Sequence, residues 1–159
     1  MVNVGIVGIG MWGKNLLSVF NSLSNVVGVS YKKDKETKDW LKNNYPSIAS
    51  TKNYEELLKN KELEVIVIAT PIKTHYRIAK DAILAKKHVF VEKPLATNPQ
   101  EVRELYRLAK KNGVVLFVGY IYLHHPCYLK LITLVDPSEI VSIKTKWKKF
   151  GSFNEDIFY

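Results

Sequence analysis

Three glycines near the N-terminus have the spacing of a phosphate-binding turn. Gly8, Gly10 and Gly13 follow an apolar, β-branched run and open a segment with helical periodicity. The first glycine permits a tight turn, the second lets the backbone approach a pyrophosphate, and the third lets helix and strand pack closely. This context predicts a dinucleotide-binding turn rather than glycines that serve packing alone. We expect Met11 and Trp12 beside the pyrophosphate, with packing at the helix start as the alternative.

The end of the second expected strand carries a serine and two lysines instead of a carboxylate. An acidic side chain there would bind the ribose hydroxyls of an adenosine, and Asp34 comes too late unless the strand is longer than expected. A serine followed by lysines suits a 2′-phosphate. We therefore predict an NAD(P) cofactor with a preference for NADP, the alternative being that the lysines are ordinary loop charges. The residues assigned to this part of the cofactor site are Ser30, Tyr31, Lys32 and Lys33.

Two later segments, residues 69–75 and 89–96, follow further buried strands. Open α/β sheets bind ligands at the carboxyl ends of their strands, so side chains in both segments are candidates for one site. These candidates are Thr70, Pro71, His75, Glu92 and Lys93. Together with the glycine turn, the two segments resemble the glucose-fructose oxidoreductase/inositol dehydrogenase (Gfo/Idh/MocA) family, and the resemblance extends over the whole chain.

The resemblance implies an NAD(P)-dependent dehydrogenase. Enzymes of this family transfer a hydride between a nicotinamide cofactor and a sugar, cyclitol or nucleotide-sugar hydroxyl. By this resemblance Lys93 is the catalytic residue, near the nicotinamide and the reacting hydroxyl, and a lysine that handles protons needs a finely placed pKa. Thr70, Pro71, His75 and Glu92 belong to the same mouth of the cofactor site. The expected substrate is a sugar-like small molecule.

Residues 10–16 and 118–126 are similar to one branch of the family, which is associated with nucleotide-sugar metabolism. In that branch the second segment leads into another domain. His124 and His125 stand where the branch has an aromatic residue and an asparagine, so hinge packing and substrate contact both remain open for them. No further cysteine or acidic partner joins them and Cys127 at zinc-ligand spacing, and we predict no metal site.

Alternating apolar strands and amphipathic helices must position these residues. Strands that are apolar on both faces indicate a parallel sheet covered by helices on both sides, and the leading topology is a doubly wound α/β Rossmann fold. The expected strands are residues 2–9, 26–30, 65–69, 88–91 and 114–118. The expected helices are one opened by the glycine turn with apolar positions from Leu16 to Leu23, 35–44, a short one capped by Asn53 with Glu56, 74–86, and one from a Thr97/Gln100 capping box to Gly113.

The pattern changes near Tyr120. Residues 1–120 are expected to form the NAD(P)-binding domain, and residues 121–159 the first helix (126–135) and first strand (139–150) of an incomplete α+β domain for substrate binding and dimerisation. One strand cannot stand alone. We therefore expect a truncated chain that lacks the complete active site, with a full-length form that is a homo-oligomer. The alternative is a non-catalytic NAD(P)-binding sensor or regulatory module.

Composition excludes several other classes. The chain has 159 residues and a single cysteine, which suits one ordinary core and excludes a disulfide framework. No apolar run has the length of a membrane helix and no signal-peptide pattern is present, so we expect a cytoplasmic protein without a membrane partner. Lysine supplies 21 of the 24 positive charges behind the net charge of +9, with no recognisable nucleic-acid-binding motif. Nucleic acid is not an expected partner.

Overall fold

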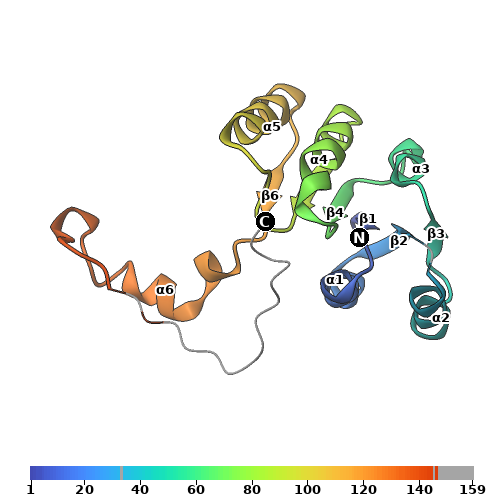
Figure 1. The fold of residues 1–159 in the computed structure, drawn as a ribbon, viewed down its shortest axis with the longest axis horizontal. Coiled ribbons are helices and arrows are strands. Elements are labelled where there is room, and N and C mark those ends of the chain that lie inside the picture. The colour runs from blue at the N-terminus through green and yellow to red at the C-terminus, as the bar shows by residue number, and fades with distance from the viewer. Residues whose placement is uncertain (33, 145, 147–159) are drawn as a thin grey trace. The chain divides into compact units, whose positions relative to one another are not determined.

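The chain divides into two compact units, residues 1–120 and residues 121–159. A computed structural model describes residues 1–32, 34–144 and 146 (Figure 1). Strands and helices alternate along the first unit, and the described part of the second consists of short helical turns.

Six parallel strands of the first unit form one sheet in the order β3-β2-β1-β4-β5-β6. The strands are β1 (Asn3–Val7), β2 (Asn25–Ser30), β3 (Ala49–Thr51), β4 (Val65–Ile68), β5 (His88–Val91) and β6 (Leu116–Val118). The chain runs outward from β1 to β3, returns to the centre at β4, and runs outward again to β6. This topology confirms the predicted doubly wound α/β fold and places its switch point between β1 and β4.

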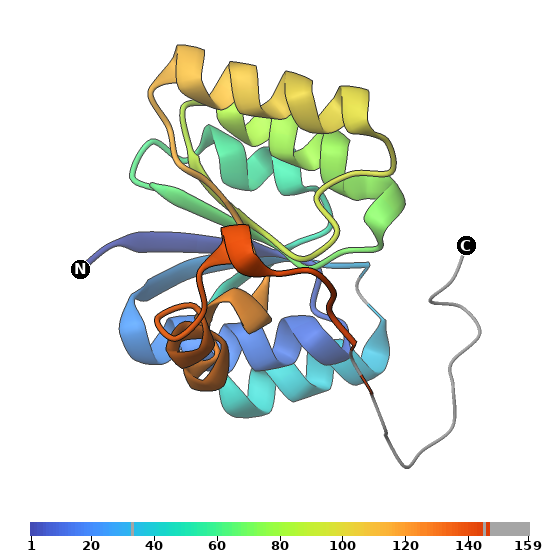
Figure 2. The same ribbon diagram turned by 90° about the vertical axis from the view of Figure 1, so that its left-hand side faces the viewer.

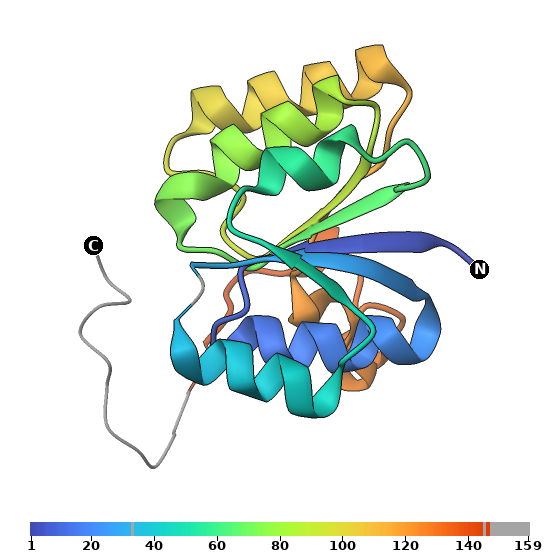
Figure 3. The same cartoon turned by 90° about the vertical axis from the view of Figure 1, so that its right-hand side faces the viewer.

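Helices cover both faces of this sheet (Figures 2 and 3). Helices α1 (Met11–Leu23) and α2 (Lys35–Asn44) lie on one face, and α3 (Tyr54–Lys59), α4 (His75–Leu84) and α5 (Pro99–Asn112) lie on the other. Side chains alternate between the faces along a strand, so Val67 belongs to one apolar core while Ile66 and Ile68 belong to the other. Each strand must therefore be apolar on both sides, and such continuous apolar runs are what predicted the strands from the sequence.

A polar network joins α4 to α5. The Lys80 ammonium donates a hydrogen bond to Glu104 Oε1 over 2.7 Å, and the Tyr76 hydroxyl donates to Glu104 Oε2 over 2.7 Å. The bond to Glu104 raises the pKa of Lys80 to about 12, and the bond from Lys80 holds the pKa of Glu104 below its ordinary value. These groups are partly exposed, so the network orients the helices more than it stabilises them.

Two elements of the first unit differ from the sequence prediction. Strand β3 was not predicted, because its three residues are small or polar and pair only with β2 at the edge of the sheet. The helix predicted over 74–86 is a 3-10 turn (Ile72–Thr74) followed by α4, which ends at Leu84. Lys86 has a φ of 61°, a left-handed conformation that a continuing helix does not allow.

The helix caps agree with the prediction in one place and differ in another. Asn53 caps α3 as predicted and accepts from the Glu55 N–H, although the Glu56 carboxylate bonds to Thr51. The predicted Thr97/Gln100 box at the start of α5 was wrong by one residue. Asn98 is the cap there and accepts from the Glu101 N–H over 2.9 Å. Pro99 at the first helical position favours this register.

The second unit contains less regular structure than predicted. The helix expected over 126–135 is α6 (Pro126–Leu131), which is shorter because the Thr133 hydroxyl and N–H both bond to the Lys130 carbonyl and tighten the chain into turns. The strand expected over 139–150 is not formed in the described residues. Pro137–Glu139 is a 3-10 turn, residues 140–144 and 146 form no strand, and the rest of the segment lies outside the described residues.

No helix in the described part of the chain is long and apolar enough to cross a membrane.

The corrected cap of α5 is testable by alanine substitution. Asn98→Ala removes the side-chain acceptor of the Glu101 N–H and should lower the free energy of unfolding by about 1 kcal/mol. Gln100→Ala is the matched control and should change it by less than about 0.5 kcal/mol. Urea unfolding followed by circular dichroism measures both. An equal loss in the two variants would contradict the assignment of the cap to Asn98.

Candidate functional site

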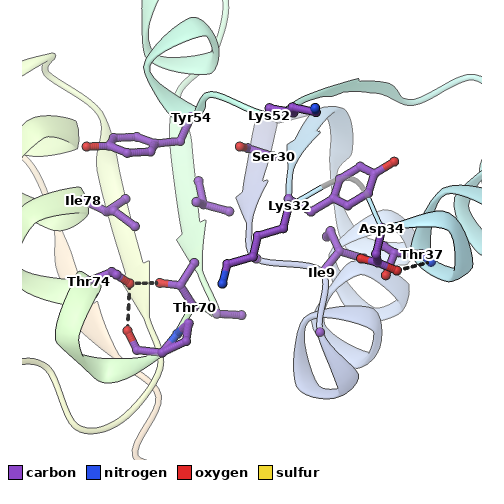
Figure 4. A pocket seen from close by; sticks show the side chains of 16 residues that line it. Ile9, Ser30, Lys32, Asp34, Thr37, Lys52, Tyr54, Thr70, Thr74 and Ile78 are labelled. Carbon is purple, nitrogen blue, oxygen red and sulfur yellow. Dashed lines mark hydrogen bonds between the residues drawn. The ribbon is translucent and has the colours of Figure 1, made fainter.

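A cavity of about 550 Å³ opens at the carboxyl ends of the central strands (Figure 4). The loops after β1, β2, β3 and β4 form its walls, which places it at the switch point where doubly wound sheets bind ligands. Its lining residues are Val7, Gly8, Ile9, Gly10, Ser30, Tyr31, Lys32, Asp34, Thr37, Lys52, Tyr54, Ala69, Thr70, Pro71, Thr74 and Ile78. Residues from three separate predicted motifs therefore meet in one cavity.

The three glycines of the turn have different structural requirements. Gly8 has a φ of +96°, and a Cβ there would lie 2.7 Å from the Ala69 carbonyl oxygen of the loop after β4. A Cβ on Gly13 would overlap the Gly8 carbonyl. A Cβ on Gly10 would meet nothing within 4 Å. Close packing explains why positions 8 and 13 are glycine. At Gly10 no protein atom fills the space where a Cβ would lie, so a ligand can approach the backbone there.

Helix α1 begins in this open space. Gly10 is its N-cap and contributes no side-chain hydrogen bond, and the first turn contains no acidic residue. The N–H groups at the start of the helix and the positive end of its dipole are consequently available to an anion. Met11 and Trp12, which were expected beside a pyrophosphate, are 86% and 46% exposed and do not line the cavity.

The end of β2 brings a hydroxyl and a cation to the cavity. Ser30 is buried and lines it, and the exposed Lys32 side chain extends into it (Figure 4). Tyr31 also lines the cavity while most of its side chain is buried in the core beside α1 and α2. Lys33, the fourth residue expected here, lies outside the described residues.

Asp34 is occupied by a structural task. Its carboxylate accepts from the Thr37 backbone N–H over 2.7 Å and caps α2. This backbone hydrogen bond holds the pKa of Asp34 below its ordinary value. The carboxylate nearest to the end of β2 is thus committed to the helix that follows.

Several lining residues were not assigned to the site by the sequence analysis, among them two that follow β3 and two that follow β4. Lys52 and Tyr54 follow β3, a strand that was not predicted, and Thr74 and Ile78 belong to the turn and helix after β4. Burial, reinforced by the hydrogen bond that its hydroxyl donates to Asp81, raises the pKa of Tyr54 to about 12. Tyr54 is therefore a neutral wall of the cavity. Recognising residues 49–51 as a strand would have placed Lys52 at this edge of the sheet.

The loop after β4 presents two hydroxyls. The Thr74 hydroxyl donates to the Pro71 carbonyl over 2.7 Å and also lies within hydrogen-bonding distance, 2.7 Å, of the Thr70 hydroxyl (Figure 4). Thr70, Pro71 and Thr74 all line the cavity. His75, expected on the same wall, is 2% exposed and points into the protein instead.

Glu92 and Lys93 follow β5, one strand further along the sheet. The Glu92 N–H donates to the Ile68 carbonyl over 2.9 Å, which holds this segment beside the end of β4. Glu92 is buried, and a Cβ on Gly119 would lie 3.1 Å from its Oε1. Lys93 is exposed. Neither lines the cavity described above; both follow β5, which pairs with β4, the strand that precedes the Thr70 loop.

The histidines and the cysteine of the second unit do not form a metal site in the described part of the chain. His125 caps α6 by accepting from the Cys127 N–H, and Cys127 is an exposed free thiol. Among the described residues no three His, Cys, Asp or Glu side chains come together as metal ligands.

The topology, the glycine turn and the cavity at the switch point define a dinucleotide-binding Rossmann domain. Residues 2–120 match the family model for Gfo/Idh/MocA, which is described as an oxidoreductase family with an NAD-binding Rossmann fold. The chain belongs to this Gfo/Idh/MocA family.

Relatives from three organisms illustrate the family. An uncharacterised oxidoreductase of Synechocystis is 37% identical over 62% of this chain and 27% of its own length. A dTDP-3,4-didehydro-2,6-dideoxy-alpha-D-glucose 3-reductase of Streptomyces violaceoruber is 31% identical over 60% of the chain and 28% of its own length. Inositol 2-dehydrogenase of Salmonella typhimurium is 29% identical over 87% and 43%. The chain thus spans less than half the length of these relatives.

Solved structures have the same fold. The biliverdin reductase of Synechocystis, in complex with biliverdin and NADP+, matches with a TM-score of 0.74 and 27% identity over 83% of this chain and 42% of that one. A 3-ketoreductase from Actinomadura kijaniata, in complex with NADP and TDP-benzene, matches with a TM-score of 0.75 over 84% and 41%. At 21% identity the second likeness concerns the fold alone.

The glycines provide a matched pair of substitutions. Gly10→Ala should leave the free energy of unfolding nearly unchanged, because its Cβ meets nothing, but should weaken NADPH binding about tenfold or more by filling the ligand space. Gly13→Ala should destabilise the fold by about 1–3 kcal/mol, because its Cβ overlaps the Gly8 carbonyl. Urea unfolding and calorimetric titration measure the two effects. Unchanged NADPH binding in the Gly10 variant would contradict a phosphate position over Gly10.

Proposed function

We propose that this chain is the cofactor-binding part of an NAD(P)-dependent oxidoreductase that acts on a sugar-like hydroxyl or ketone. The observation that carries the proposal is the arrangement of the glycine turn. Gly8 and Gly13 are required by packing, Gly10 is not, and the uncapped start of α1 opens into the cavity beside it. A pyrophosphate fits such a place because it needs close backbone approach and N–H donors.

The residues around the cavity fit the rest of a dinucleotide. An adenosine half would extend from Gly10 toward Ser30 and Lys32, and a nicotinamide half toward Thr70, Pro71 and the segment of Glu92 and Lys93. When bound, the cofactor supplies or accepts the hydride. The chain's own residues hold the cofactor, exclude water from one side of it, and present polar groups at its reactive end.

NADP is the cofactor that this cavity favours. Ribose binding by NAD-type sites uses a free carboxylate near the end of β2, and Asp34 is instead engaged with the Thr37 N–H. Lys32 extends into the cavity, and Lys52 lies at its edge after β3. Two lysines that line the same cavity as the Ser30 hydroxyl supply positive charge that suits a 2′-phosphate.

Lys93 is the residue that we assign to proton transfer. It is exposed and follows the carboxyl end of β5, the strand paired with β4, which precedes the Thr70 loop; an oxidised nicotinamide bound there would place a positive charge nearby. An ammonium there can donate a proton to the oxygen of a substrate ketone during reduction, or accept it back during oxidation as the amine. Glu92, the residue before it, is buried, and its N–H donates to the Ile68 carbonyl, which ties the start of this turn to β4.

The second unit supports a wider proposal about the whole protein. We assign residues 121–159 to the beginning of a substrate-binding and dimerisation domain, and the complete enzyme to the cytoplasm as a homo-oligomer. Relatives that reduce a deoxysugar ketone or oxidise inositol support a sugar, cyclitol or nucleotide sugar as substrate. The substrate contacts themselves would come from the second domain.

Calorimetric titration of the chain with NADPH and NADH tests the cofactor assignment. NADPH should bind at least about tenfold more tightly than NADH, and Lys32→Ala should lower NADPH affinity about tenfold while leaving NADH affinity nearly unchanged. Lys38→Ala, an exposed lysine on α2, is the matched control and should change neither. Equal affinities for the two cofactors would overturn the NADP preference, and no binding of either would overturn the cofactor-binding role.

The role of Lys93 predicts a separation of binding from turnover. In the enzyme that contains this chain, Lys93→Met should lower kcat about a hundredfold or more with little change in NADPH affinity, because proton transfer is lost and the cofactor contacts remain. Lys73→Met changes an exposed lysine of the neighbouring loop and should leave kcat nearly intact. Steady-state kinetics and titration measure both quantities. Turnover that survives in the Lys93 variant would remove it from the mechanism, and binding without turnover in the unmodified protein would favour a sensor.

A further inference from the structure

His75 is buried between the two loops that form the nicotinamide end of the proposed site. It is the first residue of α4 and only 2% exposed, so it cannot touch a ligand in the cavity. On one side its ring contacts the backbone of Thr70, a residue that lines the cavity. On the other side lies Pro94, the residue after Lys93.

Both nitrogens of the His75 ring contact backbone carbonyl oxygens. Nδ1 lies 2.8 Å from the Pro94 carbonyl oxygen, and Nε2 lies 2.6 Å from the Thr70 carbonyl oxygen. A carbonyl oxygen only accepts hydrogen bonds, so each nitrogen must carry a proton for its contact to be a hydrogen bond. A ring with one proton donates a hydrogen bond to one of the two loops, whereas a ring with two protons donates one to each loop.

The two loops follow β4 and β5, which are neighbouring strands of the sheet. The last backbone bond between them joins the Glu92 N–H to the Ile68 carbonyl, before either loop reaches its functional residue. The imidazole spans the two loops past that point. One rigid ring thereby sets the distance from Thr70, on the cavity wall, to the turn that carries Lys93.

We propose that His75 is a positioning residue, doubly protonated, which holds Lys93 and the Thr70 wall in register at the nicotinamide end of the cofactor. The inference rests on the cofactor-binding role proposed above and adds to it a residue that acts only through others. It replaces the direct cofactor contact expected for His75 from the sequence. The adenosine end of the cavity, formed by loops after β1, β2 and β3, does not depend on this ring.

That separation of the two ends provides the test. Calorimetry compares NADPH with 2′-phospho-ADP-ribose, which lacks the nicotinamide, on the 159-residue chain. The unmodified chain should bind NADPH more tightly than 2′-phospho-ADP-ribose. His75→Leu should abolish most of this difference, about fivefold or more, and should leave the affinity for 2′-phospho-ADP-ribose within about twofold.

Two further variants separate positioning from folding. His75→Gln keeps an N–H donor. Even if the leucine variant unfolds, the glutamine variant should retain part of the higher affinity for NADPH over 2′-phospho-ADP-ribose. His88→Gln is the matched control, because His88 lies at the opposite end of β5, where its Nδ1 accepts from the Val115 N–H. It should change neither affinity.

Nitrogen NMR of the histidine rings gives a readout that is independent of any ligand. Both His75 nitrogens should show attached protons in the folded chain, and a bare ring nitrogen would overturn the two-sided tie. Failure of the unmodified chain to bind either ligand would overturn the proposed function. Two other results would leave the proposed function standing and overturn the positioning role. In the first, the unmodified chain binds NADPH no more tightly than 2′-phospho-ADP-ribose. In the second, the difference between the two affinities is the same in His75→Leu and His75→Gln as in the unmodified chain.

Discussion

The close approach of β1, α1 and β4 at the glycine turn is the constraint on which the rest of this structure depends. Gly8 and Gly13 leave no room for a Cβ, because the Ala69 carbonyl and the Gly8 carbonyl occupy the positions where one would lie. This contact allows α1 to begin close to the switch point, with its N-cap residue Gly10 in the lining of the cavity. A side chain at either position would push the helix away and move the anion-binding end out of reach of the other loops.

The charge of the cavity depends on which acidic side chains near it already have partners in the neighbouring helices. The carboxylate of Asp34 is used to cap α2, and Glu36, in the first turn of α2, pairs with Lys14 of α1. Tyr54 remains a neutral hydroxyl because burial and Asp81 raise its pKa to about 12. Among the described residues that line the cavity, the acidic one is Asp34, and its carboxylate already accepts from the Thr37 N–H. Lys32 therefore faces the cavity without an unengaged carboxylate in this lining. An anionic ligand is the complement of such a surface.

The parallel sheet explains why residues from distant motifs can cooperate. All six strands end at the same edge, so the loops after β1, β2, β3 and β4 meet around one cavity and the loop after β5 lies beside it. Hydrogen bonds between strands align these loops only as far as the strands extend. Beyond their ends, side chains such as Thr74 and His75 supply the connections, and they do so from within the turn and helix that follow β4.

The sequence by itself determined the fold class, five of the six strands, and the glycine turn, because apolar residues on both faces of buried strands and glycines at fixed spacing are local signals. It also located Ser30, Lys32, Thr70 and Pro71, which do line the cavity. Only the tertiary structure decided that β3 exists and brings Lys52 to the cavity, that Asp34 is a helix cap, and that His75 turns inward. The pairing of β3 with β2 and the inward position of His75 depend on which backbone groups from separate segments lie within hydrogen-bonding distance, and no local pattern in the chain encodes that distance. The Asp34 cap is a local contact with Thr37, and the structure showed that its carboxylate is used there.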